Sequence, residues 1–212
     1  MTPLSILIAD DHAVVRAGLR TLLESRPRWQ VCAEAADGRD AVEKAAKHKP
    51  QIAILDIGMP LLNGVEATRQ IRKASPSTEI LILTMHESDD LVQQVVEAGA
   101  RGYILKDEAD RVLLDAVQAL SQHKPFFSTR VSEAAVTTDL DSAKTSRSRL
   151  TPREREILQL LAEGKSNKEV ANLLNISVNT AEAHRANIML KLDFHSLAEL
   201  VLYAIRNNII QT

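Results

Sequence analysis

Residues 1–121 alternate short apolar runs with amphipathic stretches, and this alternation limits the possible fold more than any other feature of the chain. The apolar runs lie at Leu4–Ala9, Val31–Ala35, Ile52–Leu55, Ile80–Leu83 and Gly102–Leu105. Stretches with apolar residues at helical spacing lie at 12–26, 38–48, 64–74, 88–98 and 109–121. Strands that alternate with helices pack as a parallel sheet covered on both faces. We therefore predict an α/β domain with a five-stranded parallel sheet over residues 1–121.

Residues 149–212 show only helical patterns. The segment Thr151-Pro152-Arg153-Glu154 is typical of a helix start, because threonine caps, proline suits the first turn and the glutamate completes a capping box. Gly164 is a typical helix end. Further helices are predicted at about 167–174, 178–192 and 196–208, which makes this a small all-α domain of four helices. Residues 122–148, rich in Ser, Thr, Asp, Lys and Arg toward their end, are predicted to form a linker.

Composition excludes several classes of protein. Cys32 is the only cysteine, so the chain has no internal disulfide and no thiolate metal cluster of its own. The six histidines lack HExxH spacing, which argues against a zinc enzyme. No apolar run approaches the roughly 18 residues that span a membrane, and the N-terminus lacks a leader pattern. We expect a cytoplasmic protein that does not contact membranes.

Net charge is −2, and residues 149–212 carry eight basic and seven acidic side chains. The net charge of residues 149–212 is thus too small to bind nucleic acid by itself. Any such contact must depend on individually placed charges and on symmetry.

Polar residues end four of the predicted strands: Asp10 and Asp11 the first, Asp56 the third, Thr84 the fourth and Lys106 the fifth. In a parallel sheet these ends meet at one edge, where ligands bind. Three carboxylates close together repel one another unless a cation joins them. Hard oxygen ligands at an open site favour Mg²⁺.

These residues lie in motifs that resemble those of bacterial response-regulator receiver domains. The matching segments are Ala9-Asp10-Asp11-His12, Ile54-Leu55-Asp56-Ile57-Gly58-Met59-Pro60-Leu61-Leu62-Asn63-Gly64, Leu83-Thr84 and Tyr103-Ile104-Leu105-Lys106. The resemblance covers residues 1–121 and implies a flavodoxin-like fold. It implies that Asp56 accepts a phosphoryl group from a sensor histidine kinase, and a carboxylate can act as such a nucleophile.

The same resemblance implies a role for each neighbouring residue. Asp10, Asp11, Asp56 and the main-chain carbonyl of Gly58 would hold Mg²⁺. Lys106 would pair with the phosphoryl oxygens, Thr84 would donate a hydrogen bond to them, and Tyr103 would be the aromatic switch that moves with Thr84.

Residues 149–212 resemble the LuxR-type helix-turn-helix domain of the NarL/FixJ class of response regulators. The matching segments are 150–156, 164–171, 176–180, 184–188 and 191–192. Helix 178–192 would enter the major groove. The resemblance places Glu182, Ala183 and Ala186 against base edges, and makes Lys165, Lys168, Asn179, Thr180, His184, Arg185 and Lys191 candidates for phosphate or sugar contacts. Arg185 could also read guanine.

Two departures from that domain are visible. Position 175 carries Asn where many relatives carry glycine, and Asn tolerates a left-handed turn. Glu182 and Ala183 replace residues that are basic or branched in some relatives, which leaves the target sequence open.

An aspartyl-phosphate enzyme of the dehalogenase type needs a second carboxylate, which Asp56-Ile57-Gly58 lacks. A receiver-bearing adaptor that acts through protein contacts stays an alternative. We predict a phosphorylation-switched transcriptional regulator, not an enzyme, that binds promoter DNA as a homodimer. Leu197, Leu200, Val201 and Ala204 form the apolar stripe expected to pair two copies, unless that stripe belongs wholly to the domain core.

Overall fold

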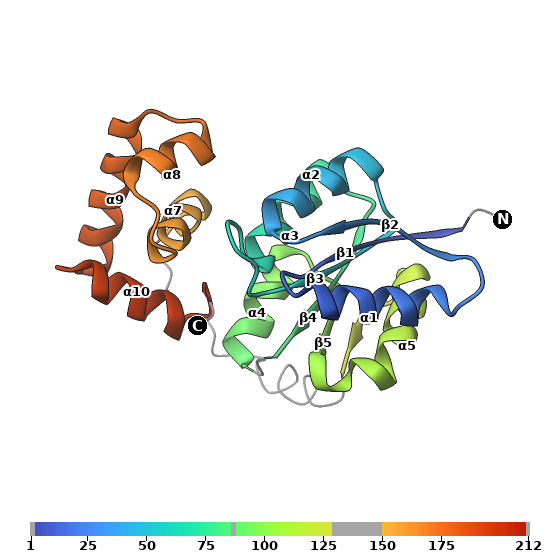
Figure 1. Ribbon diagram of the computed structural model, residues 1–212. Coiled ribbons are helices and arrows are strands. Elements are labelled where there is room, and N and C mark those ends of the chain that lie inside the picture. Colours follow the sequence, from blue (N-terminus) through green and yellow to red (C-terminus); the bar gives the residue numbers. More distant parts are fainter. Residues whose placement is uncertain (1–2, 86–87, 129–149, 211–212) are drawn as a thin grey trace.

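The computed structural model describes residues 3–85, 88–128 and 150–210. An α/β unit formed by the first two ranges lies beside a helical unit formed by the third (Figure 1). Both predicted fold types are confirmed. The predicted linker falls largely on residues 129–149, which lie outside the described residues.

The sheet of the α/β unit is parallel throughout, with the order β2-β1-β3-β4-β5-β6. Its strands are β1 (Leu4–Ala9), β2 (Trp29–Ala35), β3 (Ile52–Asp56), β4 (Glu79–Thr84), β5 (Gly102–Leu105) and β6 (Phe126–Phe127). Central strands β3 and β4 are buried along their whole length, because helices cover both faces of a parallel sheet.

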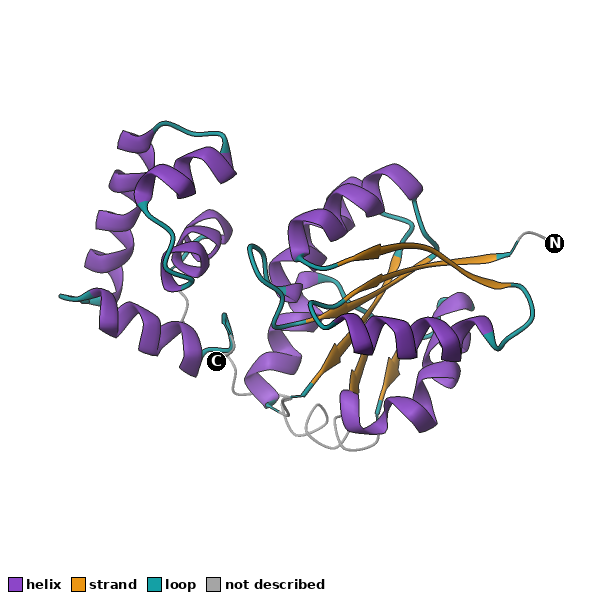
Figure 2. Ribbon diagram, viewed as in Figure 1, coloured by secondary structure: helices purple, strands orange, loops and turns teal. Residues whose placement is uncertain are grey.

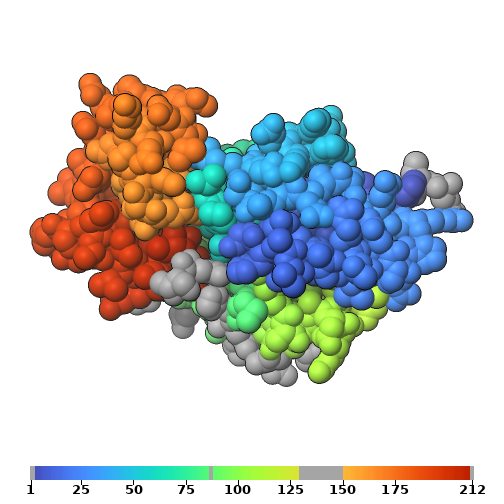
Figure 3. All heavy atoms as spheres, in the orientation of Figure 1, coloured from blue at the N-terminus to red at the C-terminus, as the bar shows by residue number. Residues whose placement is uncertain are grey.

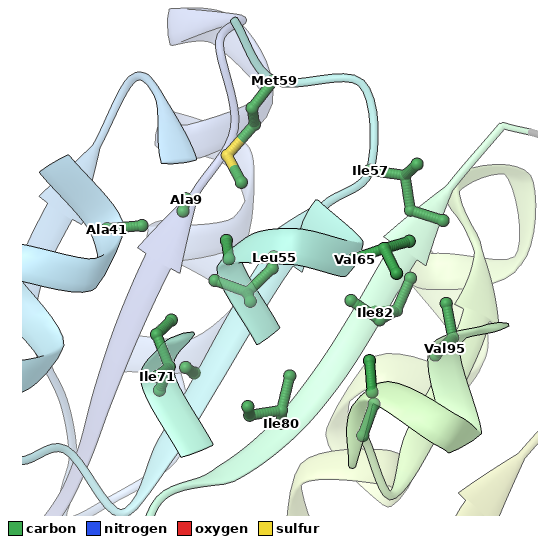
Figure 4. Packing of buried hydrophobic residues seen from close by; sticks show 14 of the residues in the cluster. Ala9, Ala41, Leu55, Ile57, Met59, Val65, Ile71, Ile80, Ile82 and Val95 are labelled. Carbon is green, nitrogen blue, oxygen red and sulfur yellow. The ribbon is translucent and has the colours of Figure 1, made fainter. Parts of the chain in front are cut away.

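Helices cover both faces of the sheet (Figure 2). They are α1 (Ala13–Glu24), α2 (Gly38–His48), α3 (Gly64–Ala74), α4 (Asp89–Ala98) and α5 (Ala109–Ser121). Because successive side chains of a strand point to opposite faces of the sheet, each strand contributes side chains to two cores. Leu55 and Ile82 pack with α2, α3 and α4, whereas Ile54 and Leu83 pack with α1 and α5. Figure 4 shows the first core, where Met59 from the loop after β3 joins Ala9 and Leu55.

The sheet has six strands, so the prediction of five was wrong. Phe126 pairs with Gly102 and Phe127 with Tyr103, and the two rings pack on opposite cores. A two-residue strand is too short to show alternation in the sequence. Its pairing with β5 depends on a contact across more than 20 positions of the chain.

The helical unit contains α7 (Pro152–Ala162), α8 (Asn167–Leu174), α9 (Val178–Leu192) and α10 (Leu197–Arg206). The predicted capping box is present: Thr151 N–H donates to Glu154 at 2.8 Å, and Glu154 N–H donates to the Thr151 hydroxyl at 3.2 Å. Asn175 ends α8 in the left-handed conformation, with φ 51°, as its residue type allows. The described residues include no helix with the length and apolar content that crossing a membrane requires.

Candidate functional site

The predicted acidic cluster forms at the carboxyl edge of the sheet. Asp10 follows β1, Asp56 ends β3 and Lys106 follows β5. The Lys106 ammonium lies between the two carboxylates, with Nζ 2.7 Å from Asp10 Oδ2 and 3.1 Å from Asp56 Oδ1. Both carboxylates are 1% exposed. Three residues far apart in the sequence thus meet in one buried site.

The site holds more negative charge than its lysine balances. Asp56 Oδ2 is buried and has no hydrogen-bond or ion-pair partner among the described residues. Burial raises the pKa of Asp56 and Asp10 adds to the rise, although Lys106 opposes it. Burial acts to lower the pKa of Lys106, but its bonds to Asp10 and Asp56 outweigh burial and raise it. A cation fits this excess of charge.

Ligand atoms for such a cation lie on Asp10 and the two residues that follow it. Asp10, Asp11 and His12 offer ligand atoms within 4.8 Å of one another. The Asp11 side chain is 34% exposed, so that water can complete a coordination shell. Gly58, the predicted carbonyl ligand, lies in the loop two residues after Asp56. Hard oxygen donors at an open position suit Mg²⁺.

His12 is a member of this cluster that the sequence did not single out. Its ring Nδ1 lies 2.8 Å from Asp11 Oδ1, and its main-chain N–H donates to Asp10 Oδ1 at 2.8 Å. The signal for it was its place directly after the aspartate pair, at the N-cap of α1. The backbone donation holds the Asp10 carboxylate in its orientation.

Thr84 and Tyr103, the predicted switch pair, lie on neighbouring strands and are fully buried. Thr84 ends β4 one residue beyond Leu83, the residue that pairs with Asp56. The Tyr103 ring belongs to the core beside α4. The pair therefore connects the phosphoacceptor edge to the α4 side of the sheet.

The helical unit contacts the loop between β3 and α3, an arrangement that no sequence pattern predicted (Figure 3). The Gln159 side chain on α7 donates to the Met59 carbonyl at 3.0 Å and accepts from Asn63 N–H at 2.8 Å. Glu163 accepts from Leu61 N–H at 3.0 Å. These bonds join residues about 100 positions apart.

Ionic and polar pairs surround that contact. Arg155 donates to Glu66 at 2.5 Å, and Gln70 donates to Glu156 at 2.5 Å. Arg39 on α2 donates to the Leu173 carbonyl at 3.2 Å. A hollow of about 570 Å³ opens beside them, between α3, α4 and the start of α7, and holds none of the predicted site residues.

Most of the predicted DNA-contacting residues, which lie on α8, on α9 and in the loop before α8, are open to solvent. Exposed side chains are Lys168, Asn179, Thr180, Glu182, Ala183 and Ala186, while Lys165, His184 and Arg185 are half-buried. The contact between the two units does not cover these exposed residues. Lys191 differs from the others, because its Nζ lies 2.7 and 2.8 Å from the two carboxylate oxygens of Glu154.

The apolar stripe predicted on the last helix divides between core and surface. Leu200 and Ala204 are fully buried inside the helical unit. Leu197 is 43% exposed, and Leu202, which lies outside the predicted stripe, is 51% exposed. Leu197 of the predicted stripe therefore remains at the surface, together with Leu202 outside it.

Family models match both parts of the chain. Residues 6–118 match the response regulator receiver domain, and residues 148–204 match the luxR family of bacterial regulatory proteins. Oxygen regulatory protein NreC of Staphylococcus epidermidis RP62A is 39% identical, and the match covers 98% of this chain and all of that protein. NreC of Staphylococcus haemolyticus is 40% identical, with 98% and 99% covered.

Solved structures show the same architecture. RcsB of Salmonella enterica serovar Typhimurium, bound to promoter rprA with the phosphomimetic BeF₃⁻, is 28% identical with a TM-score of 0.64, over 95% of this chain and 98% of that one. The response regulator ChrA of a heme-sensing two-component system is 33% identical with a TM-score of 0.54, over 99% and 100%.

Proposed function

The chain belongs to the response regulators that join a receiver domain to a LuxR-type DNA-binding domain, and from this premise we propose that phosphorylation of Asp56 switches its binding to promoter DNA. It is a transcription regulator of a two-component system and not an enzyme. We propose domain limits of 1–121 and 149–212, with residues between them as the linker.

The transfer step uses the buried carboxylate as nucleophile. An Asp56 oxygen attacks the phosphorus of a phosphohistidine on a sensor histidine kinase. A new P–O bond forms as the P–N bond breaks, and the imidazole leaves with the electron pair and takes up a proton. Asp10, Asp11, Asp56 and the Gly58 carbonyl would hold Mg²⁺, which when bound neutralises charge on the phosphoryl oxygens.

Neighbouring side chains then bind the phosphoryl group on Asp56. Lys106 already lies within 3.1 Å of Asp56, so its ammonium can move onto a phosphoryl oxygen with little displacement. Thr84 ends the adjacent strand, and its hydroxyl can donate a hydrogen bond to another phosphoryl oxygen. Movement of Thr84 frees space beside Tyr103, which passes the change to the face around α4.

The second domain supplies DNA binding. The exposed positions on α9 face outward, as a helix that enters the major groove requires. One relative, RcsB, has been described as two dimers bound to two parallel DNAs. We assign this chain to the same mode of action, a homodimer on promoter DNA in the cytoplasm.

The observation that carries the proposal is Asp56 itself, a buried carboxylate with one unpartnered oxygen beside a lysine. Incubation with acetyl phosphate and Mg²⁺ should add one phosphoryl group at Asp56, as located by mass spectrometry after trapping of the acyl phosphate. Asp56→Asn and chelation of Mg²⁺ should each abolish the label. Asp110→Asn changes an exposed carboxylate on α5 and should leave it intact. Full labelling of Asp56→Asn at another residue would contradict the proposal.

A further inference from the structure

We infer that Arg16 on α1 and Glu34 on β2 are positioning residues for the proposed Mg²⁺ site. They act by holding the peptide bond that joins Asp10 to Asp11, the first two acidic residues of that site. The inference rests on the proposed function, in which these carboxylates hold the metal ion. It adds the side chains that determine where the carboxylates lie.

Arg16 reaches the site through a main-chain atom. Its Nη1 donates to the Asp10 carbonyl oxygen at 2.6 Å, and its side chain is only 17% exposed. A peptide bond is planar, so the carbonyl of Asp10 and the N–H of Asp11 lie in one plane. A hydrogen bond that fixes this carbonyl oxygen therefore fixes the orientation of the peptide that leads into Asp11.

Asp11 depends on its main chain more than Asp10 does. The Asp10 carboxylate is fixed by its own contacts, because Oδ1 accepts from the His12 main-chain N–H and Oδ2 lies 2.7 Å from Lys106 Nζ. The Asp11 carboxylate contacts the His12 ring, which is itself 63% exposed. An exposed ring restrains its partner weakly, so the position of the Asp11 carboxylate follows from the peptide that Arg16 holds.

Glu34 holds Arg16 in turn. Its Oε2 lies 3.5 Å from Arg16 Nε, so the guanidinium contacts Glu34 at one end and the Asp10 carbonyl at the other. Glu34 lies opposite Ile8 in the pairing of β2 with β1, the strand that ends just before Asp10. A planar guanidinium with two acceptors has one preferred orientation. The two strands and the first turn of α1 are thus joined at the base of the metal site.

Arg20 provides a comparison on the same helix. It lies one turn after Arg16, and its Nε donates to Glu34 Oε1 at 2.6 Å. Within the described part of the chain it makes no hydrogen bond or ion pair with Asp10 or Asp11. Loss of either arginine removes one positive charge and one partner of Glu34, but only loss of Arg16 frees the Asp10 carbonyl.

Charge alone predicts the opposite effect of Arg16 on the metal. A cation near the site repels Mg²⁺, so removal of the guanidinium should strengthen metal binding if charge were its only action. Removal of a positioning bond should weaken metal binding instead, because residues that orient the ligands contribute about ten- to hundredfold to metal affinity. The sign of the change therefore separates positioning from electrostatics.

Mn²⁺ is the probe, since it takes the same oxygen ligands as Mg²⁺ and its free ion is counted by electron paramagnetic resonance. The full chain is titrated with Mn²⁺ without any phosphoryl donor. Arg16→Met keeps the apolar stem and removes the donors, and we expect its Kd for Mn²⁺ to rise about tenfold. Competition with Mg²⁺ should give a similar factor. Arg20→Met is the matched control and should leave both affinities as in the wild type.

Glu34→Gln tests the second residue, and it also decides the matter if Arg16→Met does not fold. We expect Mn²⁺ binding about threefold weaker, because the amide keeps an acceptor but loses the charge that orients Arg16. The double variant should bind Mn²⁺ as weakly as Arg16→Met alone, since Glu34 acts through Arg16.

Unchanged or tighter Mn²⁺ binding by either single variant, in protein whose Asp56 is labelled by acetyl phosphate, would overturn this inference alone. An equal loss in Arg20→Met would do the same, and so would losses from Arg16→Met and Glu34→Gln that add in the double variant. A wild-type chain that takes no label on Asp56 would overturn the proposed function together with it.

Discussion

At the scale of single residues, function at Asp56 conflicts with stability. The carboxylate is 1% exposed, and burial is the main reason that its pKa is raised. A pKa that is higher in the folded than in the unfolded chain means that ionisation favours unfolding. The ionised site therefore lowers the free energy of unfolding at neutral pH, as expected where a site must be poised for a ligand.

Asp56→Asn should accordingly stabilise the protein. In buffer with chelator at pH 7, we expect urea unfolding to give a free energy higher by about 1–2 kcal/mol. The gain should be absent below the ordinary pKa of aspartate and should grow as pH rises through the raised pKa of Asp56. Asp110→Asn is the control, because that carboxylate is exposed. An equal gain at pH 3 and pH 7 would show that charge is not its cause.

At the scale of elements, the first turn of α7 depends on a residue from α9. Burial acts to raise the pKa of Glu154, but hydrogen bonds from Lys191 and Thr151 outweigh it and lower that pKa. A lowered pKa contributes stability above the ordinary pKa of glutamate, and this stability is lost as pH falls. Lys191 thus supports the capping box from the helix that is predicted to bind DNA.

Lys191→Met should reduce the stability of the DNA-binding domain. We expect a loss of about 0.5–1 kcal/mol at pH 7, since the lysine is partly exposed and screened. The difference should shrink as pH falls through the ordinary pKa of glutamate. Thermal unfolding followed by circular dichroism at pH 7 and pH 4 measures it. A loss of equal size at both values would contradict the assignment to Glu154.

Lys168 is the predicted DNA-contacting lysine with which Lys191 can be compared. It is exposed on α8 and makes no ion pair within the described residues. Lys168→Ala should leave the unfolding free energy unchanged. It should weaken binding to all DNA sequences alike and flatten the slope of log affinity against log salt by about one unit. A changed sequence preference would mean that Lys168 contacts bases rather than phosphate.

At the scale of the whole molecule, we predict that two copies pair through apolar side chains of α10 that lie outside the domain core. Leu197 and Leu202 remain about half exposed on α10, while Leu200 and Ala204 stabilise the domain itself. Leu202→Glu should therefore spare folding but weaken pairing of two copies on DNA. Sedimentation with BeF₃⁻ and promoter DNA should show two wild-type chains bound and one Leu202→Glu chain. Two variant chains bound with unaltered affinity would place the dimer contact elsewhere.

Local sequence patterns were enough to predict the α/β alternation, the helix starts and the residues that gather at Asp56. Each of these follows from local patterns: apolar runs, capping residues, and polar residues at strand ends that a parallel sheet brings to one edge. The left-handed turn at Asn175 was also predictable, because it depends on one residue type.

Four features became visible only in the folded chain: the sixth strand, the ion pair of Lys191 with Glu154, the exposed leucines of α10 and the docking of α7 on the loop between β3 and α3. Gln159 bonds to Met59 across 100 positions, and nothing near either residue marks the pairing. Gln159 stands in an ordinary helical pattern, and Leu61 carries no sign of its left-handed backbone. Local patterns encode which face of an element is buried, whereas the partner that covers it emerges only when distant elements meet.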